Sequence, residues 1–366
     1  MSHTNLNGDS VGHDEAGQRN TALALGHSSS QVSGSPPASV SEINSNSSAS
    51  LSPLYSIETL PNKGRCLIAS QDISPGALLI REKPLLMAPR DLAPAALETM
   101  IQLTLKTLPK HQQRQYLSLQ NNFAGNYPFG GIIPTNAYPC GQESGKCAVY
   151  PTICLFNHSC RPNCQHAWND EEGVETVYVI RPVRKGEELC VSYEVSGPSM
   201  DRKAMLEEAF AFKCACEACS LEAEEQAASD ARHLAIQRLD ERISRLHSRP
   251  PLGVLWDCRL LLQILRAEYK GYPGTFAARV YWDAFQVTIA HGDLARARIF
   301  VERSYKEAVI CEGDNTPEVK SVKVLVKDPA SDDSFEKSSK DWSTDVDMVP
   351  RGLDDDEFEK WLFRLQ

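Results

Sequence analysis

Short apolar runs bounded by turn residues occur in two regions of the chain, and one of them, residues 174–183, alternates apolar and polar residues; both patterns are typical of β-strands. The first region predicts strands over residues 65–70 and 77–82, with a Pro-Gly turn between them. The second region predicts strands over residues 174–183 and 189–193. The pattern therefore predicts a β-rich part whose strands lie far apart in the sequence.

Between the two regions, the spacing of apolar residues becomes helical. Within residues 91–130, large apolar residues recur every three or four positions and share one face: Leu97, Ile101, Leu105 and Leu108. This spacing predicts a helical insert between the strands.

Helical spacing returns after the strands and predicts a C-terminal helical region over residues 221–318. Three or four helices fit residues 221–312, with one amphipathic face formed by Leu234, Leu239, Ile243 and Leu246. Within this region, residues 292–317 resemble one unit of a tetratricopeptide-type (TPR-like) helical pair.

The two ends of the chain differ in composition from the middle. Residues 1–52 are rich in Ser, and the first fifty contain no aromatic residue, so we expect them to be disordered. Residues 319–366 are acidic, and we expect a mostly flexible tail in which a helical turn docks through Phe358, Trp361 and Leu362.

Composition and charge narrow the possible classes of protein. Hydrophobic residues make up 42% of the 366 residues, which is enough for a sizeable core, yet no apolar run is long enough to span a membrane. The N-terminus lacks a basic stretch followed by an apolar core, so we expect an intracellular protein of the nucleus or cytoplasm. In a reducing compartment, twelve cysteines indicate metal binding or packing rather than disulfides. The net charge of −10 disfavours direct binding to nucleic acid and suits a basic peptide as partner.

Two motifs accompany the last predicted strands: one precedes the strand at residues 174–183, and the other contains the strand at residues 189–193. Residues 157–164 read NHSCRPNC, a dense polar run that either forms a buried turn or binds a ligand. Residues 186–193 read GEELCVSY and end a strand in Tyr193. A tyrosine in this place is either part of the core or a phenol presented to a cleft.

A third motif consists of closely spaced thiols. Cys214, Cys216 and Cys219 lie within six residues, so they can face one Zn²⁺ ion. A structural zinc ion takes four ligands, so a fourth ligand must come from elsewhere in the chain. The competing interpretation is a group of free, buried cysteines.

The order of these motifs resembles that of a SET domain followed by a post-SET motif. The entry segment NKGRCL at residues 62–67 is similar to the N-terminal motif of this family, and GIIPTNAY at residues 131–138 resembles a segment of its SMYD-like branch. The matches cover about residues 55–220. The resemblance implies an α+β fold of small sheets with a pseudo-knot and a helical insert. It also implies a SET domain over residues 53–196 and a post-SET zinc segment over residues 197–220.

The family's functional residues carry over to matching positions of this chain. Tyr193 is implied to be the catalytic tyrosine, and Cys160 is implied to join the three clustered thiols as the fourth zinc ligand. Phe212 is implied to stack on the adenine of S-adenosylmethionine, and Asn136 to reach its amino-acid part. The other residues implied to hold this cofactor belong to the entry loop and the NHS segment: Lys63, Gly64, Arg65, Asn157 and His158.

Two features depart from the family's pattern. Cys66 stands where the family usually has a second glycine, so the entry loop is intact only if this position does not need a positive φ. The MYND zinc finger of the SMYD branch is absent, since residues 91–130 contain no cysteine, as in the fungal SET proteins that lack the finger.

The resemblance implies a protein-lysine N-methyltransferase that transfers methyl from S-adenosylmethionine to a lysine of a protein substrate, a histone tail being one candidate. The alternative is an inactive SET-fold interaction module, which Cys66 and the helical C-terminal half would favour. A zinc-dependent nucleic-acid binder is opposed by the acidic charge. We expect a monomer without membrane contact. The sequence specifies neither the target lysine nor the degree of methylation.

Overall fold

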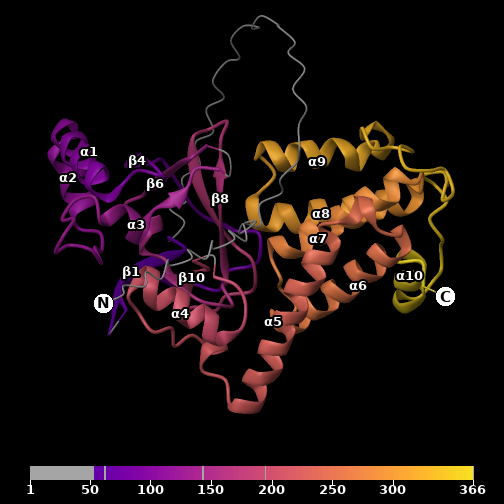
Figure 1. The fold of residues 1–366 in the computed structure, drawn as a ribbon, viewed down its shortest axis with the longest axis horizontal. Helices are drawn as coiled ribbons and strands as arrows, with labels where there is room; N and C mark the ends of the chain where they lie inside the picture. Colours follow the sequence, from indigo (N-terminus) through magenta and orange to yellow (C-terminus); the bar gives the residue numbers. More distant parts are fainter. Residues whose placement is uncertain (1–52, 62, 142–143, 194, 366) are drawn as a thin grey trace, which may run out of the picture.

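The computed structural model describes residues 53–61, 63–141, 144–193 and 195–365. Small sheets and short helices form one side of the molecule, and long helices form the other (Figure 1). The α+β class predicted from the sequence is therefore confirmed. The expected disordered segment, residues 1–52, lies outside the described residues. None of the described helices is both long and apolar enough to cross a lipid bilayer.

The described strands form three small sheets. The first has the order β1 (Tyr55–Leu60), β2 (Gly64–Ala69), β10 (Glu188–Val191) and β7 (Asn157–His158). The second has the order β3 (Leu78–Glu82), β9 (Val174–Val179) and β8 (Cys164–Asn169). The third has the order β4 (Leu86–Pro89), β6 (Lys146–Val149) and β5 (Tyr138–Pro139). The predicted strands are present, although β9 ends at Val179 and β10 at Val191, so Tyr193 lies beyond its strand and both strands end earlier than the sequence predicts.

The first sheet brings together three distant parts of the sequence. Strand β2 lies between β1 and β10, and its last four residues are all buried. Strand β10 pairs in parallel with β7, with Cys190 opposite Asn157 and Val191 opposite His158. This pairing places the NHSC segment beside the strand that leads to Tyr193.

The predicted helical insert is present and packs on the third sheet. It contains α1 (Pro94–Thr107) and α2 (Lys110–Leu117), followed by the short helix α3 (Ile132–Asn136). The predicted apolar face of α1 is buried at Leu97, Ile101 and Leu105. Helix α1 ends before Pro109, because the residue preceding a proline disfavours the α conformation.

After α4 (Ser199–Phe210), the C-terminal half consists of long helices, as predicted. These are α5 (Ala223–Ile243), α6 (Pro251–Glu268), α7 (Thr275–Ala290), α8 (Leu294–Glu312) and α9 (Pro317–Lys327). Leu239 and Ile243 are buried in their common core, whereas Leu234 is exposed, so the predicted face is wrong at that position. Residues 292–317 contain only α8, and its neighbour α7 precedes them, so they do not form a helical pair by themselves.

The C-terminal segment, expected to be mostly flexible, packs against these helices instead. Helix α10 (Asp355–Leu362) starts with a capping box and buries Leu362 and Phe363 in the helical core. Arg364 donates to the fully buried carboxylate of Asp293, with 2.6 Å between Nη2 and Oδ2. The expected docking through Phe358, Trp361 and Leu362 is therefore present, and a buried ion pair adds to it.

A buried carboxyl group at the end of α8 should make the free energy of unfolding depend on pH. Glu312 is buried, and burial, followed by the nearby Glu318 carboxylate, raises its pKa to about 7. Between its ordinary value of 4.5 and this value, the folded state keeps a proton that the unfolded state has lost, so stability falls as pH rises through that window. A shift of this size corresponds to about 3 kcal/mol.

We therefore expect Glu312→Gln to gain unfolding free energy relative to the wild type as pH rises from 4 to 8, by up to about 3 kcal/mol. Urea unfolding at several pH values measures this difference. Glu208→Gln, at an exposed position, is the matched control and should show no such trend. A difference that does not change with pH would contradict the buried, protonated state of Glu312.

Candidate active site and metal centre

Tyr193 and the NHSC segment are held together by backbone and side-chain hydrogen bonds. The Tyr193 amide donates to His158 Nδ1 at 3.0 Å, and the Tyr193 hydroxyl donates to the Phe156 carbonyl at 2.8 Å. Because His158 Nδ1 accepts a hydrogen bond, the neutral ring carries its proton on Nε2, 3.3 Å from the Cys160 sulfur. One histidine thus connects the predicted catalytic tyrosine to a predicted zinc ligand.

Aromatic rings surround Tyr193. The ring centroid of Phe210 lies 4.8 Å from that of Tyr193, and that of Phe212 lies at 6.3 Å in an edge-on arrangement. Burial raises the pKa of Tyr193 well above its ordinary value of 10. Its phenol is therefore neutral at physiological pH, and it acts as a hydrogen-bonding group rather than a base. The sequence analysis missed Phe210, which the pattern AFAFKC could have indicated.

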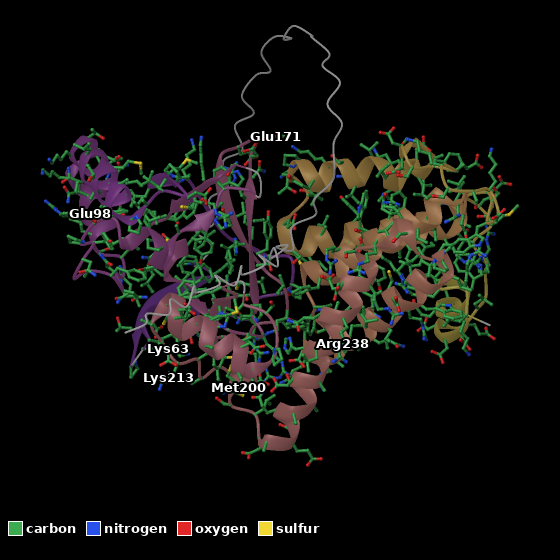
Figure 2. All side chains as sticks on the ribbon, viewed as in Figure 1. Lys63, Glu98, Glu171, Met200, Lys213 and Arg238 are labelled. Atoms are coloured by element: carbon green, nitrogen blue, oxygen red, sulfur yellow. The ribbon has the colours of Figure 1, made fainter. Side chains whose placement is uncertain are left out.

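The entry loop is connected to the NHSC segment by Glu188, which the sequence analysis also missed. Lys63 Nζ lies 2.6 Å from one carboxylate oxygen of Glu188, and Asn157 Nδ2 donates to the other at 2.8 Å. The hydrogen bond between Lys63 and Glu188 is the main reason why the pKa of Lys63 is raised. Lys63 and Lys213 project at the same edge of the molecule (Figure 2).

The entry loop keeps the backbone that a glycine-containing turn needs. Gly64 has a φ of +72°, and nothing lies within 4 Å of where its Cβ would be, so the loop is open at this point. Cys66 is fully buried within β2 and is not among the described residues with positive φ. The departure from the usual glycine at this position therefore leaves the loop intact.

The turn after α2 holds three parts of the site. Arg65 Nη2 donates to the Ser118 carbonyl at 2.5 Å, and Asn136 Nδ2 donates to the Gln120 carbonyl at 2.6 Å. Asn122 Nδ2 donates to the Phe210 carbonyl at 2.7 Å. The insert therefore positions the entry loop, the end of α3 and the aromatic segment before the cysteines. Within the described part of the chain, the Asn136 side chain donates to Gln120 and Ile132 and not to the entry loop.

The four predicted zinc ligands come together in space. The sulfurs of Cys160, Cys214, Cys216 and Cys219 all lie within 4.8 Å of one another. The Cys160 and Cys219 sulfurs are 3.6 Å apart, and a tetrahedral Zn–S₄ site requires an S–S distance of about 3.8 Å. The four residues therefore match the donor type and the spacing of a structural zinc site.

A buried arginine gives independent support for a charged metal centre. Arg202 in α4 is 1% exposed, and its Nη1 donates to the Gly197 carbonyl. Its Nε and Nη2 atoms have no hydrogen-bond partner among the described residues, and the guanidinium lies beside Cys160 and Cys219. An unpaired buried cation is costly, whereas four thiolates around Zn²⁺ carry a net negative charge that offsets it. The surroundings therefore fit a bound zinc ion.

The family of this β-rich part follows from comparison with known domains. Residues 64–194 match the model of the SET domain, which covers the entry loop, the NHSC segment and Tyr193. The chain contains a SET domain. The resemblance inferred from the motifs is thereby confirmed.

Curated relatives extend this result beyond the SET domain. Histone-lysine N-methyltransferase set5 of Schizosaccharomyces pombe is 28% identical over 281 residues, which are 76% of this chain and 85% of that protein. Human histone-lysine N-methyltransferase SMYD3 is 32% identical over 94 residues, 25% of this chain and only 22% of SMYD3. The SMYD3 similarity is thus limited to a quarter of the chain, whereas the set5 similarity is longer than the SET domain itself.

One solved structure that aligns with most of this chain is only distantly similar to it. The SET domain of LSMT bound to lysine and AdoHcy aligns with 75% of this chain and 87% of its own, at 13% identity and a TM-score of 0.31.

Proposed function

We propose that this SET-domain protein is an S-adenosylmethionine-dependent protein-lysine methyltransferase whose active site is built around Tyr193. The observation that carries the proposal is the geometry of Tyr193: a neutral phenol, surrounded by aromatic rings, whose hydroxyl lies 2.8 Å from the Phe156 carbonyl. The relatives named as histone-lysine methyltransferases support the same activity.

The cofactor-holding residues are assigned to the loop and segment that Glu188 connects. We assign Lys63, Gly64, Arg65, Asn157 and His158 to this role, with Phe212 against the adenine and Asn136 towards the amino-acid end. S-adenosylmethionine, when bound, supplies a methyl group on a positively charged sulfur. The open space at Gly64 and the partly exposed ring of Phe212 fit such a molecule.

The acceptor lysine has to lose its proton before it can attack a methyl group. Its ordinary pKa is about 10.4, and burial in an apolar channel lowers this value because the charged form loses its hydration. Phe210, Phe212 and Tyr193 provide such apolar surfaces. The Tyr193 oxygen and the Phe156 carbonyl are placed to orient the amine and the methyl group, and orientation is a large part of catalysis in such transfers.

The zinc site has a structural role in this proposal. Four thiolates fill the coordination of the ion and leave no position for a reacting water molecule. Because Cys160 follows His158 and Cys214 follows Phe212 by two residues each, a bound zinc ion would fix both parts of the cofactor site.

The proposed substrate is a lysine in a basic protein segment, a histone tail being one candidate. The net charge of −10 favours such a partner and opposes direct binding to nucleic acid. We further propose a monomer of the nucleus or cytoplasm. The proposed catalytic domain spans residues 53–196, with the zinc segment at 197–220 and the helical region at 221–318.

Transfer of labelled methyl from S-adenosylmethionine to core histones and to cell extract tests the proposed activity. We expect label on protein that is absent when Tyr193→Phe replaces the wild type. Binding of the cofactor without transfer to any protein would instead indicate an interaction module.

Replacing Glu188 separates cofactor binding from chemistry. Glu188→Ala removes the connection between Lys63 and Asn157, so we expect the Kd for S-adenosylmethionine to rise about tenfold, which corresponds to 1.4 kcal/mol. The transfer rate at saturating cofactor should change little, since Tyr193 is untouched. Isothermal titration calorimetry measures the Kd. The neighbouring Glu187→Ala, which contacts Asn163 and Arg181, is the matched control and should bind like the wild type.

A further inference from the structure

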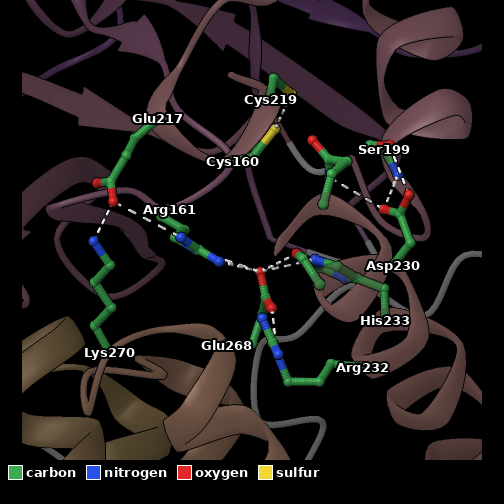
Figure 3. A network of polar contacts seen from close by, with 12 residues as sticks. Cys160, Arg161, Ser199, Glu217, Cys219, Asp230, Arg232, His233, Glu268 and Lys270 are labelled. Atoms are coloured by element: carbon green, nitrogen blue, oxygen red, sulfur yellow. Dashed lines mark hydrogen bonds and ion pairs between the residues drawn. The ribbon is translucent and has the colours of Figure 1, made fainter. Parts of the chain in front are cut away.

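The end of helix α6 contacts the first of the two segments that supply zinc ligands. Glu268, the last residue of α6, is fully buried. Its carboxylate accepts from Arg161, with 2.9 Å between Nη2 and Oε1. Arg161 directly follows Cys160 and is itself only 11% exposed at its side chain. A carboxylate of the helical region therefore reaches the residue next to a zinc ligand (Figure 3).

Helix α5 holds the Glu268 carboxylate in place. Ser229 Oγ and Arg232 Nε each donate to it at 2.8 Å, and His233 Nε2 lies at 3.4 Å. Burial by itself would raise the pKa of Glu268, but these groups together with Arg161 outweigh that effect and lower the pKa to about 2. The carboxylate is therefore ionised and fixed by α5, and Arg161 is its described partner in the SET domain.

The same end of α6 also contacts the second zinc-ligand segment. Lys270 pairs with Glu217, which lies between Cys216 and Cys219. Arg161 Nη1 lies 3.8 Å from the same Glu217 carboxylate. Figure 3 shows Arg161 between Glu217 and Glu268, with Cys160 and Cys219 above it. The two ligand segments are thus joined to each other and to α6 by charged groups.

The two contacts differ in strength. The Lys270 and Glu217 side chains are both more than half exposed, and exposed ion pairs contribute little. Glu268 and Arg161 are desolvated, and removing one partner of such a pair leaves an uncompensated buried charge. The contact between Glu268 and Arg161 therefore dominates.

We propose that Glu268 is a positioning residue of the methyltransferase site, which holds the Cys160 loop through Arg161 and so makes zinc retention and cofactor affinity depend on the C-terminal helical region. This inference rests on the proposed function. Glu268 lies 49 residues after Cys219 in the sequence, yet the last turn of α6 supports the metal ligands.

Two variants of the pair and one matched control test this role. Glu268→Gln keeps the shape of the side chain and removes its charge, and Arg161→Gln removes the other partner. Arg232→Gln is the control, because it removes an ion pair with the same carboxylate but does not contact the Cys160 loop. The rate of zinc release to a coloured chelator and the Kd for S-adenosylmethionine are measured on the full chain.

We expect Glu268→Gln and Arg161→Gln to release zinc at least about tenfold faster and to bind the cofactor more weakly, as is typical when a group supporting metal ligands is lost. Arg232→Gln should lower the melting temperature but keep the wild-type rate of release. If Glu268→Gln does not fold, the rates of zinc release of Arg161→Gln and Arg232→Gln are compared with each other to test the positioning role.

Equal rates of zinc release in Arg161→Gln and Arg232→Gln, with unchanged cofactor affinity, would overturn the inference alone, provided that the wild type binds both zinc and cofactor. A wild-type chain that binds neither would refute the proposed function as well. The two failures are therefore distinguishable.

Discussion

Tyr193→Phe should reduce methyl transfer by about 100-fold or more while the affinity for S-adenosylmethionine stays close to that of the wild type. The hydroxyl of Tyr193 donates a hydrogen bond to the Phe156 carbonyl, and we propose that its oxygen orients the acceptor amine. The ring packs between Phe210 and His158, so phenylalanine keeps the aromatic contacts and removes only this oxygen.

Single-turnover kinetics with saturating cofactor measures the transfer step, and calorimetry measures cofactor binding. The expected result is a fall in the rate without a large rise in Kd. The matched control is Tyr178→Phe, which makes the same substitution at a tyrosine of β9 outside the site and should transfer methyl like the wild type. Wild-type rates in Tyr193→Phe would rule out the assigned role of the hydroxyl.

Removing zinc should abolish detectable cofactor binding, with a loss of affinity of at least about 100-fold. Structural zinc supplies on the order of 10 kcal/mol of local folding free energy, and the ligands flank His158 and Phe212. Without the ion, the thiolates of Cys160, Cys214, Cys216 and Cys219 repel one another or take up protons, and the buried Arg202 loses its compensating charge.

Chelation and Cys219→Ser are two independent ways to remove the ion. Metal analysis should find one zinc per wild-type chain and far less in Cys219→Ser. Cys258→Ser, a buried cysteine of α6 in the helical core, is the control: it should lower stability but keep zinc. Zinc-free protein that binds S-adenosylmethionine like the wild type would contradict the proposed role of the metal.

Sequence patterns were sufficient for the elements whose signal is local. The strand around Cys66 follows from a short apolar run before a turn, the strand around Val177 from alternation, and the apolar face of α1 from helical spacing. The three clustered cysteines are visible in the sequence because a zinc ion can be held by ligands a few residues apart. Cys160, about fifty residues earlier, was assigned through the family resemblance, and the structure places its sulfur within the cluster.

Contacts between distant side chains could not be predicted in this way. Glu188 and Glu268 look like ordinary acidic residues in the sequence, and only tertiary packing brings Lys63 to the first and Arg161 to the second. The prediction of a mostly flexible C-terminal segment was wrong for the same reason. Its acidic composition indicates flexibility, whereas its docking depends on Arg364 reaching the buried Asp293. Charge in a sequence does not reveal whether a buried partner exists.

The most direct test of the central claim is tandem mass spectrometry of a substrate protein labelled by the wild-type chain, with the Tyr193→Phe reaction as the reference. We predict methyl groups on lysine side chains in the wild-type reaction and their near absence in the reference. Methyl groups on other residues, or equal lysine methylation in both reactions, would contradict a lysine methyltransferase site built around Tyr193.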